Sequence, residues 1–198
     1  MRRIYSTLIE MIAAGIFIVP IFSMYGKFIF HSLRRTIMYI IFGLYLVAVL
    51  ALVGFPNIAY ICFDITINVI PFVGMAADFH NTWLNVLLFV PLGIFLPLLW
   101  DKYKDIKCTL MFSVIMTIGI EFSQIFTHRA TDINDVIANV LGAFIGYCLI
   151  KTITNKFARY VKRESHVNEL YIVFGTAVLV MFFMQPFVSS LLWKMILA

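Results

Sequence analysis

Charged side chains are scarce in this sequence: they make up 13% of its 198 residues, whereas 63% of the residues are hydrophobic. A soluble domain carries about a quarter charged residues, so this composition excludes an ordinary soluble enzyme or binding domain. The formal net charge of +5 is spread over short segments between apolar runs. Because a nucleic-acid-binding protein concentrates its basic residues in a patch or stripe, no nucleic-acid partner is expected.

Metal-binding and disulfide motifs are also missing. The three cysteines, Cys62, Cys108 and Cys148, stand alone in or beside apolar segments, without Cys-x-x-Cys or Cys/His spacing. Neither a zinc site nor a disulfide framework is therefore predicted. The sequence also lacks a His-Glu-x-x-His motif, and we expect no metal and no cofactor.

Long apolar runs dominate what is present, and six of them approach the roughly 20 residues that a helix needs to cross a bilayer. They cover residues 7–26, 36–55, 82–100, 108–126, 133–150 and 170–192. Lipid requires the backbone to satisfy its own hydrogen bonds, and strands of alternating polarity are absent, so we predict an all-α, polytopic integral membrane bundle of five or six transmembrane helices. A shorter apolar stretch, 58–73, contains Asp64, Asn68 and Pro71 and predicts an interfacial or re-entrant segment.

The basic residues predict an orientation in the membrane. Eleven of the fifteen lie in three linkers, at residues 27–35, 101–107 and 151–169. Lys and Arg accumulate in cytoplasmic loops, so the turn at 127–132 is expected on the outer side. Both termini would then lie outside, unless the first run is interrupted at Pro20 to form a hairpin.

A group of polar residues interrupts the fourth and fifth apolar runs. Glu121 lies five residues before the end of its run, or about 7–8 Å inside a helix that rises 1.5 Å per residue. Gln124 falls on the same face. An ionised side chain within a span is expensive without a partner, and Arg129 is the nearest cation that could supply one. This arrangement predicts either a staple for the helical hairpin or a ligand site, and the sequence leaves both open.

The fifth run places polar residues and glycines on one helical stripe, because their spacing alternates between three and four. The stripe consists of Asp132, Asp135, Asn139, Gly142 and Gly146. Asp132 and Asp135 fit the N-cap and third position of a helix. Gly142 and Gly146 form a Gly-x-x-x-Gly motif, which permits close helix packing.

The third run adds an amide at the same expected depth. Asn85 precedes Pro91 and Gly93 in the stretch NVLLFVPLG. A proline inside a span frees a backbone carbonyl, which neighbouring helices must satisfy. We therefore predict a kinked helix that is packed against its neighbours.

These two polar blocks closely resemble the VanZ-like membrane protein family. The matching residues are Asn85, Phe89, Pro91, Leu92 and Gly93, then Glu121, Gln124, Arg129, Asp132, Asp135, Asn139, Gly142 and Gly146. The stretch NVIPF at 68–72 is similar to an element that precedes these blocks in the family. The resemblance covers residues 36–150, which divides the chain into an N-terminal segment with its basic linker (1–35), a VanZ-like core, and a basic linker with a final helix (151–198).

The resemblance implies a multi-pass protein of the cell membrane in a Gram-positive bacterium, associated with reduced susceptibility to the glycopeptide teicoplanin. We expect a non-enzymatic protein of the cell envelope that binds a lipoglycopeptide or a lipid-linked cell-wall intermediate among the membrane lipids. Arg129 would meet an anionic group of this ligand, and the acids would fix its position or contact an amine. The alternatives are an intramembrane enzyme that modifies a lipid or lipid-phosphate and, less favoured, a transporter. The ligand and the oligomeric state stay open.

Overall fold

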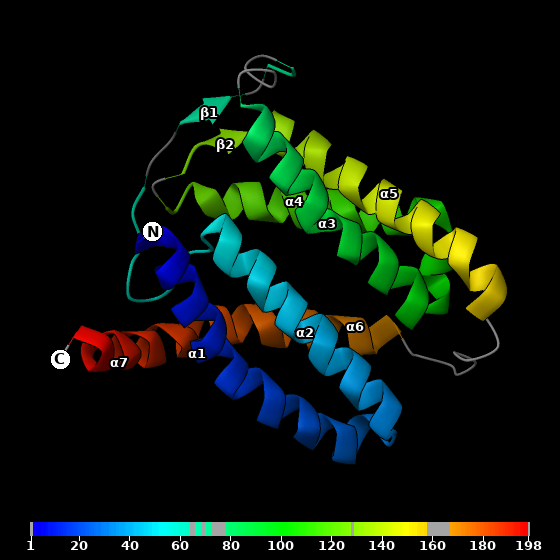
Figure 1. Ribbon diagram of the computed structural model, residues 1–198, viewed down its shortest axis with the longest axis horizontal. Coiled ribbons are helices and arrows are strands. Elements are labelled where there is room, and N and C mark those ends of the chain that lie inside the picture. Colours follow the sequence, from blue (N-terminus) through cyan, green and yellow to red (C-terminus); the bar gives the residue numbers. More distant parts are fainter. Residues whose placement is uncertain are drawn as a thin grey trace. The chain divides into compact units, whose positions relative to one another are not determined.

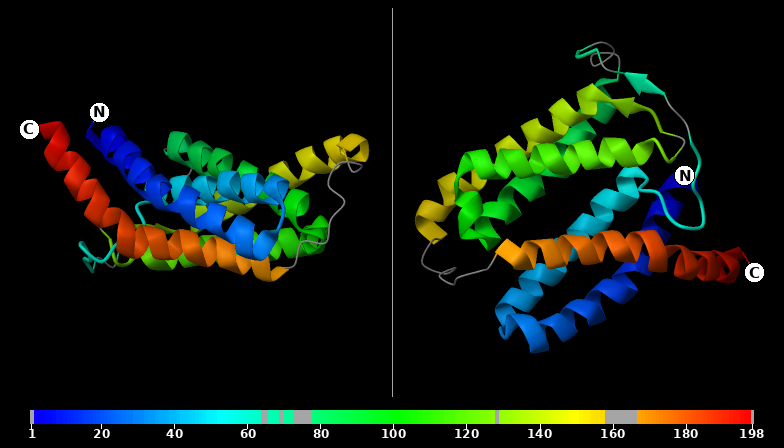
Figure 2. Two further views of the ribbon diagram at one scale, coloured as in Figure 1. Left: turned by 90° about the horizontal axis from the view of Figure 1, so that it is seen from below. Right: turned by 180° about the vertical axis from the view of Figure 1, so that it is seen from behind.

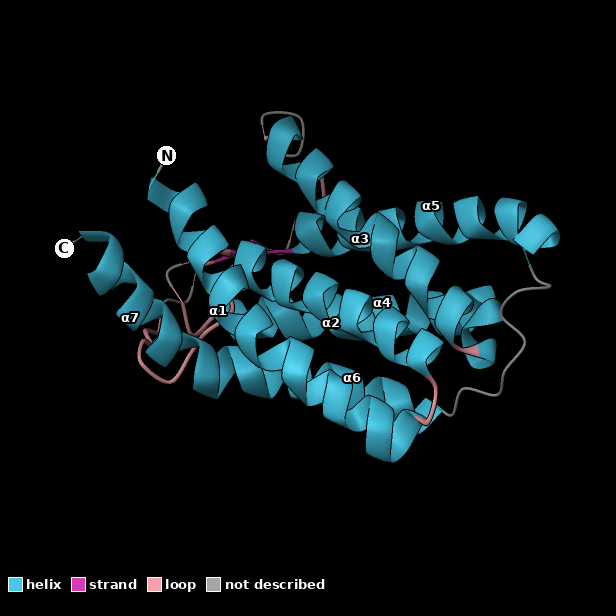
Figure 3. Cartoon of the chain, turned by 60° about the horizontal axis from the view of Figure 1, so that its bottom comes forward, coloured by secondary structure: helices cyan, strands magenta, loops and turns pink. Residues whose placement is uncertain are grey.

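The computed structural model describes residues 2–63, 66–68, 70–72, 78–127, 129–157 and 167–197, and these are mostly helical (Figure 3). Six helical spans are long and apolar enough to cross a membrane. They are Tyr5–Phe30, Leu33–Val53, Phe79–Leu99, Ile106–Gln124, Ile133–Ile153 and Asn168–Met195. Each corresponds to one of the six predicted runs, so the predicted helical membrane bundle is confirmed.

The chain forms two compact units, one from the residues up to Cys62 with those from Asn168 onward, the other from Phe63 to Val167. The first contains α1 (Arg2–Tyr25), the π-helix η1 (Gly26–Phe30), α2 (Leu33–Val53), α6 (Val167–Leu179), the π-helix η3 (Val180–Met184) and α7 (Gln185–Leu197). The second contains β1 (Ile67–Asn68), α3 (Phe79–Leu99), the 3₁₀-helix η2 (Asp101–Lys104), α4 (Ile106–Gln124), β2 (Thr131–Asp132) and α5 (Ile133–Phe157), as Figure 1 shows. The division at residues 35 and 150 stays a prediction.

The first unit begins with one continuous crossing. Helix α1 runs through Pro20 without a break, and η1 extends it to Phe30. The chain then reverses at His31, whose φ of 48° is left-handed, and α2 packs back against α1. The alternative of a hairpin broken at Pro20 is therefore wrong.

A part-buried ion pair joins α6 to α2 within this unit. Nη1 of Arg35 at the start of α2 donates to Oε1 of Glu169 in α6 at 3.1 Å. The hydroxyl of Tyr39, one turn further along α2, donates to Oε2 of the same carboxylate. Glu169 is 6% exposed, so its charge is compensated within the protein rather than by water.

The second unit is built on close contact between α3 and α5. Gly142 and Gly146 of α5 lie against the backbone carbonyls of Val86 and Val90 in α3, and a Cβ at either glycine would overlap the carbonyl oxygen. A Cβ at Gly93 of α3 would likewise overlap the backbone of α5. The contacting residues follow one another in the same order along both helices, so α3 and α5 are parallel. Helix α4 connects them and packs beside both, as two further views show (Figure 2).

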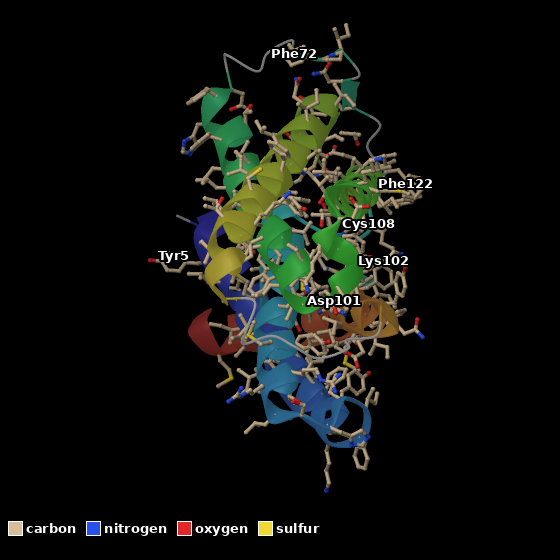
Figure 4. The ribbon with its side chains drawn as sticks, turned by 90° about the vertical axis from the view of Figure 1, so that its right-hand side faces the viewer. Tyr5, Phe72, Asp101, Lys102, Cys108 and Phe122 are labelled. Atoms are coloured by element: carbon tan, nitrogen blue, oxygen red, sulfur yellow. The ribbon has the colours of Figure 1, made fainter. Side chains whose placement is uncertain are left out.

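This connectivity separates the two ends of the unit. The beginning of α3, the end of α4 and the beginning of α5 share one end, where the polar blocks of the sequence lie. The opposite end holds η2, where the hydroxyl of Tyr147 in α5 donates to the Lys104 carbonyl at 2.6 Å and the Lys151 ammonium lies 5.7 Å from the Tyr147 ring. Figure 4 labels Asp101 and Lys102 there, and Phe72 near the other end.

Candidate functional site

The segment before α3 folds against the turn between α4 and α5. Strands β1 and β2 pair in parallel, and the Thr131 N–H donates to the Thr66 carbonyl at 2.9 Å. The Asn68 amide donates to the Asp132 carboxylate at 3.1 Å. Further along, the Phe72 N–H donates to the side-chain oxygen of Asn134 at 2.7 Å. The described part of the stretch predicted to be interfacial or re-entrant is thus extended chain and turns, of which residues 66–72 contact the start of α5, and Asp64 lies outside the described residues.

Asp132 caps helix α5. Its Oδ1 accepts the Asn134 N–H at 2.8 Å, one of the backbone donors that a helix start leaves unpaired. This contact confirms the predicted N-cap and puts Asp135 at the third helical position. Both carboxylates lie at the positive end of the α5 dipole.

The carboxylate of Glu121 is bound by the backbone of the neighbouring helix start. Glu121 is 5% exposed, and its Oε2 accepts the Asp132 N–H at 2.9 Å. The Thr131 hydroxyl donates to the Glu121 backbone carbonyl at 3.1 Å. Hydrogen bonds between side chains and main-chain groups therefore hold the end of α4 against the beginning of α5.

One guanidinium faces several carboxylates at this end. Arg129 attracts both Glu121 and Asp135, which repel each other and also interact with Asp132. The side chain of Asn85 in α3 hydrogen-bonds to Asp135. We call these five residues the acidic cluster. A single arginine balances its three carboxylates only in part.

A second polar layer lies one helical turn deeper between α4 and α5. Asn139 is 2% exposed, and its Nδ2 donates to the Thr117 hydroxyl at 2.7 Å. Its Oδ1 is buried without a hydrogen-bond partner among the described residues. Gln124 is buried in the last turn of α4, with 4% of its surface exposed.

The packing residues of α3 and α5 hold this arrangement in register. Gly93, Gly142 and Gly146 lie at the α3–α5 contact, and the same contact brings Asn85 beside Asp135. Pro91 is half-buried within α3, which continues through it. Within the parts of the chain that the structure describes, no group of His, Cys, Asp and Glu has an arrangement that could hold a metal ion.

Three contributors to the site were missed from sequence. Thr117 lies four residues before Glu121, so helical spacing alone could have found it. Asn68 and Asn134 could not be found in this way, because their contacts depend on how the segment before α3 crosses the turn.

Taken together, the six spans and the polar cluster buried at one end of a glycine-packed helix pair define a multi-pass membrane protein with a built polar site. The chain belongs to the VanZ/LLP1 family, whose model matches residues 36–155. It is similar to Protein VanZ of Enterococcus faecium, with 32% identity over 84 residues, which cover 41% of this chain and 50% of that protein. The chain thus spans about half the length of this curated relative. No solved structure matches.

Proposed function

We propose that this chain is a protein of the bacterial cell membrane that binds an amphipathic envelope ligand at the acidic cluster and thereby lowers susceptibility to teicoplanin-type lipoglycopeptides. One observation carries the proposal: Glu121 is buried at the end of a membrane span among carboxylates that one arginine only partly balances. Ionisable groups within spans are costly, and they commonly mark functional sites.

The basic linker supports an outward-facing site. Lys102, Lys104 and Lys107 lie around η2 and the start of α4, at the end of the second unit opposite the cluster. Basic loops tend to stay in the cytoplasm, which supports a position of the cluster at the outer surface. A site on that side can encounter glycopeptides and lipid-linked cell-wall intermediates.

Apolar surface beside the cluster supports the binding of an acyl tail. Phe122 follows Glu121 in α4 and is 61% exposed. Its ring centroid lies 5.6 Å from that of Phe126, which lies 5.2 Å from that of Phe63. A fatty-acyl chain would pack against these rings while its polar head contacts the acidic cluster. Resemblance to the VanZ-like family selects teicoplanin, which carries such a tail, as the drug to test.

The test replaces Arg129 with leucine in full-length protein and compares teicoplanin with vancomycin susceptibility. The control is Lys107→Leu, which removes an exposed positive charge from the opposite end of the same unit. A hydrogen bond to a charged group contributes about 1.5–3 kcal/mol, so we expect Arg129→Leu to weaken binding at least about tenfold. Cells with this variant should regain teicoplanin susceptibility, and vancomycin susceptibility should not change.

The proposal fails if Arg129→Leu reaches the membrane at normal abundance and neither drug's potency changes. A topology reporter inserted at 127–132 that is active in the cytoplasm would contradict the outward orientation. In that case the cluster could not meet ligands of the outer surface.

A further inference from the structure

The unpaired amide oxygen of Asn139 is one feature that the fold leaves unexplained. Asn139 is 2% exposed, and its Oδ1 has no hydrogen-bond partner among the described residues. Leaving a buried acceptor unsatisfied costs about 1–3 kcal/mol, and native proteins pair nearly all such groups. We therefore expect a hydrogen-bond donor from outside the described residues to bond to this oxygen.

The position of this oxygen connects it with the acidic cluster. The Asn139 amide bonds to Thr117 across the α4–α5 interface, so it projects between the two helices. Asn139 and Thr117 each lie four residues from a cluster acid, Asp135 and Glu121 respectively, or about 6 Å along the helix axis. The Asn139 amide thus lies about one helical turn beneath the two carboxylates.

Three donors in or beside the acidic cluster already bond to its carboxylates. The Asp132 N–H donates to Glu121, and the Asn68 amide donates to Asp132. The Asn85 side chain bonds to Asp135. The three carboxylates of the cluster also outnumber its one guanidinium, so the site favours a further positive charge.

We propose that the acidic cluster and Asn139 together recognise a protonated primary amine in the head of the amphipathic ligand, an inference that rests on the proposed function. An ammonium has three N–H donors, which match Asn139 Oδ1 and the carboxylates of Glu121 and Asp135. A head that carries only a phosphate could bond to Arg129, but the more numerous carboxylates would repel it. A quaternary ammonium has the charge but no N–H to donate.

Binding is tested on the purified full chain in phosphatidylcholine nanodiscs, with probes that share one tail: hexadecylamine, hexadecyltrimethylammonium and hexadecyl phosphate. A ligand that binds only the folded state raises the thermal midpoint, and the rise grows with the logarithm of the ratio of ligand concentration to Kd. We expect hexadecylamine to bind at least about tenfold more tightly than either other probe, the factor that corresponds to about 1.4 kcal/mol. Equal or tighter binding of the phosphate by the native protein overturns the inference.

Asn139→Leu removes the unpaired oxygen and is expected to weaken amine binding at least about tenfold. Because it also removes an unsatisfied buried group, the ligand-free variant should unfold close to the native midpoint. Asn139→Asp keeps an acceptor and should retain amine binding. The matched control is Gln185→Leu, which removes another amide that is 2% exposed, in the first unit, and should not alter amine binding. Unchanged amine binding in Asn139→Leu contradicts the inference.

Competition identifies the source of the amine. Weaker hexadecylamine binding in nanodiscs that contain phosphatidylethanolamine indicates a membrane aminolipid, and displacement by teicoplanin indicates the drug. The two proposals fail separately: if Arg129→Leu changes teicoplanin susceptibility but the phosphate binds best, only the amine inference falls. If neither drug's potency responds to Arg129→Leu, the proposed function falls even where amine binding persists.

Discussion

Replacing Gly142 with alanine tests the close contact on which the site depends. The added methyl group would overlap the carbonyl oxygen of Val86, which belongs to backbone and cannot move without displacing α3. Overpacking of this kind costs roughly 1–3 kcal/mol, and the preference of a helix for alanine over glycine returns at most about 1 kcal/mol. We therefore expect a net loss of stability.

Gly119→Ala is the matched control, because it adds the same methyl group to α4 where no atom lies within 4 Å. It should leave stability unchanged or raise it slightly. Thermal unfolding of both purified proteins in one detergent compares them directly. For a chain of this length, 1 kcal/mol corresponds to about 2–4 °C in the midpoint, so Gly142→Ala should unfold several degrees below Gly119→Ala.

A second readout separates packing from the site. Displacing α3 would also move Asn85 away from Asp135, so Gly142→Ala should reduce teicoplanin protection more than its membrane abundance accounts for. Equal midpoints for the two alanine variants would refute the close approach of α3 and α5, and with it the reason why Asn85 reaches the cluster.

Two further predictions concern buried charges and the helix cap. Glu169→Leu leaves the partner Arg35 without its carboxylate. Because Arg35 is 24% exposed, the loss of unfolding free energy should fall below the roughly 3–5 kcal/mol of a fully buried pair. The double variant with Arg35→Met should recover most of the thermal midpoint, and no recovery would show that the pair is not coupled. Asp132→Ala removes the cap of α5 and should cost about 0.5–2 kcal/mol in unfolding free energy. Asp132→Asn keeps an acceptor and should cost less. Equal losses of unfolding free energy in the two variants would argue against the cap.

The membrane fold could be predicted from sequence because lipid imposes one dominant constraint. Runs of apolar residues long enough to span a bilayer must form helices, and the six predicted runs became six spans. The same reasoning could not place the π-helices η1 and η3, which do not alter the apolar pattern. Nor could it decide whether Pro20 breaks the first run, because a proline inside a span is tolerated wherever its surroundings satisfy the freed carbonyl.

The candidate site could be predicted only as far as helical periodicity reaches. Spacing put Asp132, Asp135 and Asn139 on one face, and polarity within a span drew attention to Glu121. It also led us to expect that Arg129 would be the main partner of Glu121. The structure adds a partner that was not expected, because Oε2 of this carboxylate accepts the Asp132 peptide N–H, and no side-chain pattern encodes that donor.

That peptide contact has a consequence for how the family should be compared. Since the group holding Glu121 is part of the main chain, any residue except proline at position 132 supplies it. Divergent relatives can therefore retain the hydrogen bond from the peptide N–H of residue 132 to Glu121 after losing the carboxylates of Asp132 and Asp135. In such proteins the length and course of the intervening turn would be the feature to match.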